Sequence, residues 1–244
     1  MHAQFQNDAM KSSIVTGASS GIGLAIAQRL VSMNYKVYGL ARDFGKTGFS
    51  HELFVPLVAD LTKTGALEKL ITPLLASDEE FSLLVNNAGV GYFAPHEEIS
   101  LGQLQEMVTL NLTVPMLLSR LVLREIKKNQ GTIINISSIA ALKTGVWGAA
   151  YSASKAGLTH FGKCLFEDVR KTGAKVVNIH PDIVKTEFFD GLNFSVSAEE
   201  DSFVLPGCIA DAVEDVLTTR SGTVITDLTI RPQRHQLDKK KRHE

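Results

Sequence analysis

Short β-branched runs alternate with longer amphipathic stretches along almost the whole chain, and this alternation limits the fold more than any other feature. The strand-like runs are "SSIV" before residue 16, "KVYGLA" at 36–41, "LFVPLVA" at 53–59, "SLLVNN" at 82–87, "GTIINISS" at 131–138, "AKVVNIH" at 174–180 and "GTVITDLTI" at 222–230. Helical patterns fill the gaps at 21–33, 64–76, 101–128, 149–171 and 208–220. The pattern predicts an α/β fold: a single doubly wound, Rossmann-like parallel sheet of about seven strands, buried on both faces and flanked by helices.

The composition favours one domain and excludes two kinds of partner. A chain of 244 residues with 44% hydrophobic and 21% charged content is ordinary for one soluble domain. With a formal net charge of −1, the chain has no excess positive charge to attract nucleic acid. No apolar run approaches the ~18 residues that span a membrane. The two cysteines, Cys164 and Cys208, show no metal-ligand or disulfide spacing, so we predict a cytoplasmic protein without a metal.

The stretch "TGASSGIG" at residues 16–23 has two possible functions. Its middle residues satisfy G-x-S-x-G, which would make Ser19 the nucleophile of a serine hydrolase. The whole stretch also resembles a strand end, a glycine-rich turn and a helix start, where backbone N–H groups bind a phosphate. A hydrolase elbow normally follows several strands, whereas this stretch follows the first, and His180 is the only histidine well placed for a triad. We therefore predict a pyrophosphate site formed by Thr16, Gly17, Ser19, Ser20, Gly21, Ile22 and Gly23.

Lys155 lies four positions after Tyr151 on a predicted helix, so the two side chains project from one face. A nearby ammonium group favours the phenolate and is expected to lower the tyrosine pKa from about 10. The pair then forms a general acid/base. The alternative is a surface helix that carries an incidental tyrosine and lysine.

From about Lys11 to Pro232 the chain resembles the short-chain dehydrogenases/reductases. "TGASSGIG" matches the family's TGxxxGxG turn, "NNAG" at 86–89 matches its fourth-strand motif, and "YSASK" at 151–155 matches its YxxxK. The resemblance implies a catalytic set of Asn111, Ser138, Tyr151 and Lys155. It also implies that Lys155 holds the nicotinamide ribose, that Ser138 binds the substrate oxygen, and that Tyr151 protonates this oxygen when hydride reaches the carbonyl carbon.

The end of the second predicted strand indicates the cofactor. Ala41 stands where NAD-preferring members carry Asp, and Arg42 follows it, which favours the 2′-phosphate of NADP(H) over NAD(H). Asp43, and the lack of a positive charge at Ser20, weaken this preference. The resemblance assigns the remaining contacts to Asp60 and Leu61 at the adenine, Asn87, Ala88 and Gly89 at the ribose, and Ile183 and Thr186 near the nicotinamide and pyrophosphate.

Two positions modify the catalytic region. Pro115 lies four residues after Asn111 and has no N–H, so we expect a bent helix and a free Asn111 carbonyl, which in the family holds a water of the proton relay. A purely structural kink is the alternative. In "HPDIVKT", Asp182 replaces a glycine that is common in the family, and we expect backbone strain or a displaced substrate floor there.

The stretch at about 186–206 is predicted to form a substrate lid. It is rich in phenylalanine and acidic residues and contains no Lys or Arg after Thr186. Possible neighbours are Tyr92, Phe93, Val146 and Trp147. We expect a neutral, small-to-medium carbonyl compound or secondary alcohol as the substrate. The alternatives are a 3-oxoacyl-[acyl-carrier-protein] reductase, which needs a basic docking patch, and a non-catalytic NADP-binding regulator.

The sequence divides into a loose extension over residues 1–10, a Rossmann-fold catalytic domain over 11–232 and a charged tail over 233–244. The tail is expected to be a solvated end, with a partner contact as the alternative. The helices at 101–128 and 149–171 carry more apolar surface than one sheet contact requires. Related proteins pair these helices across a two-fold axis, which implies a homodimer or homotetramer.

Overall fold

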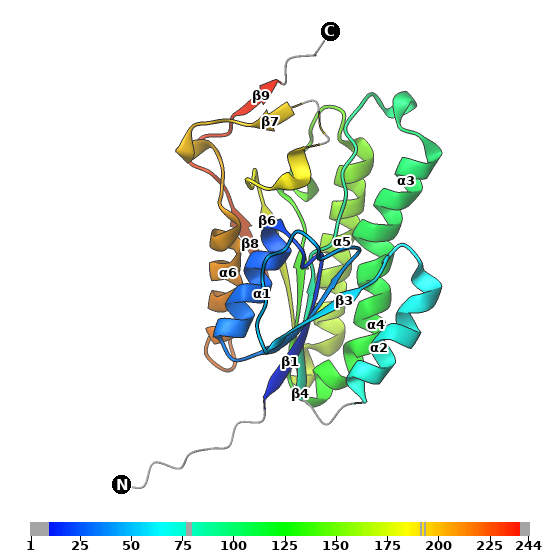
Figure 1. The fold of residues 1–244 in the computed structure, drawn as a ribbon, viewed down its shortest axis with the longest axis vertical. Helices are drawn as coiled ribbons and strands as arrows, with labels where there is room; N and C mark the ends of the chain where they lie inside the picture. The colour runs from blue at the N-terminus through cyan, green and yellow to red at the C-terminus, as the bar shows by residue number, and fades with distance from the viewer. Residues whose placement is uncertain (1–9, 77–79, 191, 193, 240–244) are drawn as a thin grey trace, which may run out of the picture.

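Parallel strands form one sheet at the centre of the protein, in the order β3-β2-β1-β4-β5-β6-β8 (Figure 1). This computed structural model describes residues 10–76, 80–190, 192 and 194–239. The strands are β1 Lys11–Thr16, β2 Lys36–Ala41, β3 Phe54–Val58, β4 Glu80–Asn86, β5 Thr132–Ile136, β6 Lys175–Pro181 and β8 Asp227–Ile230. The strand order reverses between β1 and β4, which confirms the doubly wound sheet and places a ligand crevice at the carboxyl edge of these strands.

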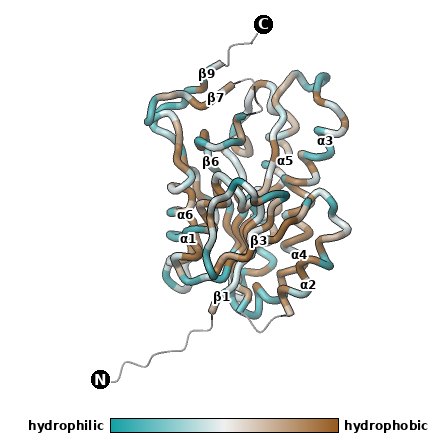
Figure 2. Tube along the Cα trace, viewed as in Figure 1, coloured by the Kyte–Doolittle hydropathy of each residue, from teal (hydrophilic) through white to brown (hydrophobic). Residues whose placement is uncertain are grey.

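Helices cover both faces of the sheet (Figure 1). On one face lie α1 Gly21–Ser32 and α6 Pro206–Thr218; on the other lie α2 Leu67–Leu75, α4 Val114–Lys128 and α5 Ala149–Val169. Each layer has its own apolar core, one including Ile26 of α1 and Val213 of α6, the other including Leu118 of α4 and Leu165 of α5. Figure 2 shows the hydrophobic residues concentrated in the strands between these layers.

The prediction of strands buried on both faces is wrong at the two edges of the sheet. The inner strand β5 is buried throughout, whereas β3 and β8 alternate between less and more exposed residues. An edge strand has one neighbour and weaker cover, so half of its side chains reach solvent. Pro56 in β3 is exposed, and its missing N–H costs no ladder hydrogen bond at an outer edge.

The helix predicted over 101–128 is divided. It consists of α3 Leu101–Val108, a π-helical turn at Thr109–Thr113 and α4. The N–H of Val114 donates to the carbonyl of Thr109, five residues back. The whole stretch Leu101–Lys128 is long and apolar enough to cross a membrane by length and composition, but core helices pass the same test. Here α4 packs against the sheet through Val122 and Ile126, which are fully buried.

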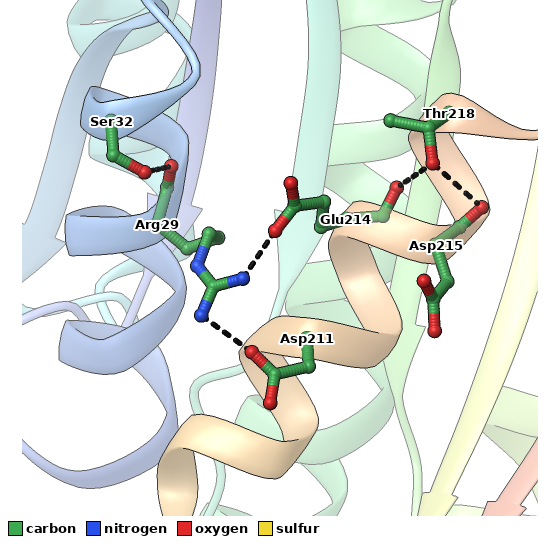
Figure 3. A network of polar contacts seen from close by, with 6 residues as sticks. All are labelled: Arg29, Ser32, Asp211, Glu214, Asp215 and Thr218. Atoms are coloured by element: carbon green, nitrogen blue, oxygen red, sulfur yellow. Dashed lines mark hydrogen bonds and ion pairs between the residues drawn. The ribbon is translucent and has the colours of Figure 1, made fainter.

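An ion-pair network joins the two helices of one layer (Figure 3). The guanidinium of Arg29 on α1 donates to the carboxylates of Asp211 and Glu214 on α6. One turn further, the Thr218 hydroxyl donates to the Glu214 carbonyl at 2.9 Å. These contacts fix α1, whose first turn belongs to the glycine-rich stretch, against α6, which follows the predicted lid.

A small second sheet lies beyond the carboxyl edge of the main sheet (Figure 1). Strand β7 Phe194–Val196, in the predicted lid, pairs antiparallel with β9 Leu237–Lys239. Near it, Arg234 donates its backbone N–H to the Asp201 carbonyl and its side chain to the Asp201 carboxylate, both at 2.9 Å. Part of the tail expected to be solvated therefore covers the lid. The remaining tail residues 240–244 and the extension 1–9 lie outside the described residues.

Candidate active site

The glycine-rich turn between β1 and α1 leaves space that side chains would fill. Gly17 and Gly21 have φ values of +66° and +54°, a region that favours glycine. A Cβ at Gly23 would lie 2.1 Å from the Gly17 carbonyl oxygen, so any larger residue would push helix and turn apart. Ser20 is the N-cap of α1, and its side chain does not cap the helix. The turn thus presents a helix N-terminus and an open backbone, which fits a dinucleotide pyrophosphate.

Ser19 is not placed as a hydrolase nucleophile. Its carbonyl accepts a hydrogen bond from the Thr47 hydroxyl at 2.9 Å, which ties the turn to the loop after β2. The buried His180 belongs to β6, three strands away from β1, or about 14 Å at the usual strand spacing. Its Nε2 lies 3.1 Å from an Asp227 carboxylate oxygen at the sheet edge. His180, the histidine considered for a triad, therefore does not lie at Ser19.

The residues after β4 hold the turn in place. The Thr16 hydroxyl accepts hydrogen bonds from the N–H groups of Asn87 and Ala88, both at 2.9 Å. The Asn87 amide donates to the carbonyls of Thr16 at 2.8 Å and Gly17 at 3.3 Å. Thr16 and Asn87 therefore fix the switch point of the sheet, and the Asn87 amide supports the turn.

The residues predicted at the adenosine end lie along the carboxyl edge of β2 and β3. Arg42 is exposed directly after β2, and Leu61 is buried beside Asp60. Hydrogen bonds from Thr62 hold the pKa of the Asp60 carboxyl below its usual range, and Arg42 adds to this effect. Asp43, whose charge weakened the predicted NADP preference, accepts the N–H of Gly45 at 2.7 Å.

Lys155 and Tyr151 are buried on the same side of α5, as their spacing predicted. The Lys155 ammonium donates to the Ile136 carbonyl at 2.9 Å, at the carboxyl end of β5. Burial lowers the pKa of Lys155 from 10.5 to about 8. The Ser137 hydroxyl donates to the Lys155 carbonyl at 3.1 Å and so fixes this turn of α5 against β5.

The expected lowering of the Tyr151 pKa is wrong for this arrangement. Burial raises the pKa of Tyr151 to about 12, because the phenolate loses its hydration, and a hydrogen bond with Ser138 opposes this only in part. The Ser138 hydroxyl also accepts the N–H of Ala140 at 3.1 Å. At neutral pH the phenol keeps its proton, which is the form that can protonate a carbonyl oxygen.

Asn111 is fully buried inside the π-helical turn and connects three segments. Its side-chain oxygen accepts the Val90 N–H at 2.9 Å, and its amide donates to the Val90 carbonyl at 2.8 Å and the Ser154 hydroxyl at 3.0 Å. A Cβ at Gly89 would lie 3.0 Å from the Asn111 side-chain oxygen and 3.3 Å from Lys155 Nζ, so these three residues converge.

Two further residues support this cluster, and sequence reasoning found only one of them. Pro115, at the start of α4, has no N–H for the Asn111 carbonyl, and the expected irregularity takes the form of the π-helical turn. Ser154 was missed. Its hydroxyl donates to the Tyr151 carbonyl at 2.7 Å and accepts from Asn111, so it couples that turn to the catalytic helix. Its place inside "YSASK" was the only available signal.

Asp182 shows no left-handed backbone, so the expected strain of that kind is absent at this position. Its N–H donates to the Ile230 carbonyl at 2.9 Å and prolongs the pairing of β6 with β8. Its carboxylate is 1% exposed, accepts from Arg231 at 2.9 Å and lies 3.2 Å from His235 Nδ1. The carboxylate therefore faces the C-terminal segment.

Thr186 and Ile183 lie close to the glycine-rich turn and the lid. A Cβ at Gly21 would meet the Thr186 methyl group at 3.1 Å, so Thr186 borders the glycine-rich turn. Its hydroxyl accepts the Phe188 N–H at 3.3 Å. Ile183 is buried, and its carbonyl accepts the Val204 N–H at 2.8 Å, which joins both ends of the lid.

Not all aromatic residues proposed for the substrate site reach Tyr151. Phe93 and Phe188 contact its ring, with centroids 5.1 and 6.0 Å away. Phe203 instead lies beneath the Lys185 ammonium, and the Tyr92 hydroxyl donates to Glu106. Val146 and Trp147 are exposed, and the Trp147 carbonyl accepts the Ala94 N–H next to Phe93, at 3.2 Å.

The chain is similar to known proteins of one family. The family profile described as short chain dehydrogenase matches residues 11–195. Serine 3-dehydrogenase from Agrobacterium fabrum is 33% identical over 180 residues, 72% of each chain. Benzil reductase from Bacillus subtilis is 35% identical over 183 residues, 71% of this chain and 74% of that one. A metagenomic short-chain oxidoreductase in complex with NADP is 30% identical, with a TM-score of 0.77 over 92% of this chain and 98% of that one. The protein is a member of the short-chain dehydrogenase family, with the fold and oxidoreductase character of that family.

Proposed function

We propose that this protein is an NADP(H)-dependent oxidoreductase that reduces a neutral, small-to-medium carbonyl compound or oxidises the corresponding secondary alcohol. The observation that carries the proposal is the burial of Tyr151 and Lys155 on one side of α5, with Ser138 close enough to the phenol to lower its pKa. The bound nicotinamide supplies or accepts the hydride. The residues of the chain supply the proton and hold the reacting oxygen.

Each member of the site has one role in this proposal. The hydroxyls of Ser138 and Tyr151 hold the carbonyl oxygen, and Tyr151 gives it a proton as the carbonyl carbon is reduced. The phenolate that remains is stabilised by the Lys155 ammonium and recovers its proton through it. Lys155 suits this exchange because burial brings its pKa to about 8, near neutral pH. Asn111 holds the neighbouring backbone and leaves its carbonyl, opposite Pro115, for a relay water.

The preference for NADP(H) rests on Arg42. Its exposed guanidinium follows β2, where the adenosine ribose is bound in this fold. The Asp43 carboxylate accepts the N–H of Gly45. This contact holds Asp43 at the backbone of the loop, which favours Arg42 as a phosphate ligand. The metagenomic relative was solved with NADP.

Two other functions are less well supported. A carrier-protein-linked 3-oxoacyl reductase needs a basic docking patch, and the candidates are Lys127, Lys128, Arg170 and Lys171. They stand just before β5 and β6, at the amino edge of the sheet, opposite the catalytic residues. Lys128 and Arg170 also pair with neighbouring carboxylates. A non-catalytic NADP-binding regulator would not need the set Asn111, Ser138, Tyr151 and Lys155, so this alternative does not explain why all four are present.

A panel of ketones, aldehydes and 3-oxoacyl thioesters, assayed separately with NADPH and NADH, tests the proposed function. We expect NADPH-dependent reduction of neutral ketones or aldehydes and little activity on the thioesters. Tyr151→Phe should abolish turnover and retain NADPH binding, because it removes only the transferable proton. Reduction that survives in this variant would contradict the role of Tyr151, and thioester-specific activity would favour the carrier-linked alternative.

We further propose a homodimer, with a tetramer as the larger possibility, in the cytoplasm. The surface formed by α3 and the start of α5 has a shallow apolar hollow lined by residues that include Leu104, Val108, Leu112 and Ala153. Val108 and Ala153 are exposed there. A two-fold contact would bury this surface. Gly157 on the same helix lies against Leu112 of the same chain, so it does not contribute to this hollow.

A further inference from the structure

Five aromatic rings form a closed circuit over the catalytic tyrosine. Going round, the centroid distances are 5.1 Å for Tyr151 to Phe93, 5.6 Å to Phe194, 6.0 Å to Phe189, 5.6 Å to Phe188 and 6.0 Å back to Tyr151. The rings come from α5, the loop after β4 and the lid. We call this set the aromatic circuit.

The aromatic circuit covers part of the Tyr151 side chain. Tyr151 is only 8% exposed, and the rings of Phe93 and Phe188 lie against its own ring. A substrate that enters on this side requires two of the rings to separate. Gly91 leaves room for two of the rings, because a Cβ there would meet the Phe93 ring at 2.7 Å and the Phe188 ring at 2.8 Å. Gly148 also lies within ordinary contact of Phe93.

Phe188 is the ring best able to move. It is 37% exposed and belongs to a single 3-10 turn, Glu187–Phe189, held at its start by the Thr186 hydroxyl. Its displacement breaks the contact with the Tyr151 ring and opens the circuit on the lid side, while Phe93 keeps its place against Tyr151. The position left empty is bordered by the rings of Tyr151 and Phe189.

From this geometry, and resting on the proposed function, we infer that the substrate carries an aromatic ring beside its carbonyl group. This ring takes the place of Phe188 in the aromatic circuit and restores the contacts that opening breaks. A saturated ring of the same size buries similar apolar area but lacks the edge-to-face attraction of an aromatic pair. The difference is worth roughly two- to tenfold in kcat/KM, or about 0.5–1.5 kcal/mol at 1.4 kcal/mol per tenfold.

Phenylacetone and cyclohexylacetone form a suitable pair of probes, because in both a methylene group separates the ring from the carbonyl and their intrinsic reactivity is alike. With NADPH, or NADH if that is the cofactor used, we expect at least roughly threefold higher kcat/KM for phenylacetone. Phe189→Leu should bring the ratio of the two ketones close to one, with unchanged KM for the cofactor, because Phe189 borders the position that the substrate ring takes. Phe188→Leu should keep the ratio, because the substrate ring displaces Phe188 in any case. Phe188→Tyr should keep the preference.

Phe166→Leu is the matched control, because this phenylalanine lies further along α5, beneath the Arg170 guanidinium, outside the aromatic circuit. It should leave the ratio unchanged. Equal rates for both ketones in the unaltered protein, or a preference for the saturated one, would overturn the inference. So would reduction of aliphatic aldehydes without either ketone, although the proposed function would then stand. Failure with every carbonyl compound and both cofactors would instead reject the proposed function.

Discussion

At the scale of single residues, burial controls the proton affinities of Tyr151 and Lys155, the proposed catalytic pair. Tyr151 and Lys155 share one side of α5, yet the Lys155 ammonium donates to the Ile136 carbonyl. Loss of hydration moves the pKa of the phenol to about 12 and that of the ammonium to about 8. The i, i+4 spacing predicted that the two side chains would share one face of the helix. It could not predict the pKa shifts, because the burial depends on residues distant in the sequence, such as Phe93 and Phe188 at Tyr151 and Gly89 at Lys155.

The buried ammonium predicts a distinctive dependence of stability on pH. Between the folded pKa of about 8 and the ordinary value of 10.5, the unfolded chain binds a proton at Lys155 that the folded chain does not. The contribution of Lys155 to the free energy of unfolding should therefore rise with pH in this window, by a few kcal/mol in all, and be flat below it.

Urea denaturation of the unaltered protein and of Lys155→Met, from pH 7 to pH 10, measures this contribution as a difference. The range stops at pH 10 because Tyr151, whose pKa is raised from 10.0, acts in the opposite direction above it. Parallel curves for the two proteins would contradict this prediction, because they would mean that folding does not lower the pKa of Lys155.

Arg42→Ala should weaken NADPH binding at least roughly tenfold and leave NADH binding nearly unchanged, because a charge-assisted phosphate contact is worth about 1.5–3 kcal/mol. Fluorescence titration with each cofactor measures the effect. Arg124→Ala, at an exposed position of α4, is a control for the loss of one positive charge. Equal losses with both cofactors would mean that Arg42 has a structural role.

At the scale of secondary structure, the long periodic elements could be predicted and the short ones could not. Strand β2 has the predicted bounds, and Pro115 indicated where the helix over 101–128 is irregular. Strands β7 and β9 have three residues each, too few to show a period, and their pairing joins segments far apart in the sequence. The main-sheet residues of the site were predictable because parallel strands bring their carboxyl ends to one edge.

The C-terminal strap, residues 231–239, should stabilise the lid through Asp182. Asp182→Asn removes the charge that pairs with Arg231 and lies beside His235, which should cost about 1–3 kcal/mol of local stability. Limited digestion with trypsin should then cleave faster after the exposed Lys185. Glu200→Gln, at an exposed lid position, should cleave like the unaltered protein. Unchanged cleavage in Asp182→Asn would remove Asp182 from this role.

At the scale of the whole molecule, one edge of the sheet and one helical surface carry exposed apolar residues. At one edge β3 carries the exposed Val58, whereas the surface formed by α3 and α5 carries the hollow around Val108. A charge placed in a two-fold interface loses its hydration when the copies associate. Because both copies carry the change, two such charges enter the interface, and association is strongly weakened.

Val108→Glu should therefore convert the proposed oligomer to a monomer and lower its activity, since the same surface includes the start of the catalytic helix α5. Val58→Glu, an identical change at a residue 72% exposed, should leave the mass unaltered. Light scattering at micromolar concentration distinguishes the two. A monomeric mass for the unaltered protein would show that the hollow is not an interface between copies.

The pairing of β7 with β9 has a consequence for the order in which a newly made chain acquires its parts. A ribosome releases β7 well before β9, since all of α6 and β8 lie between them. When β8 has emerged, every strand of the main sheet is present and the glycine-rich turn can form. The lid strand still lacks its partner at that moment. During synthesis, the protein should thus become able to bind its cofactor before it can close over a substrate.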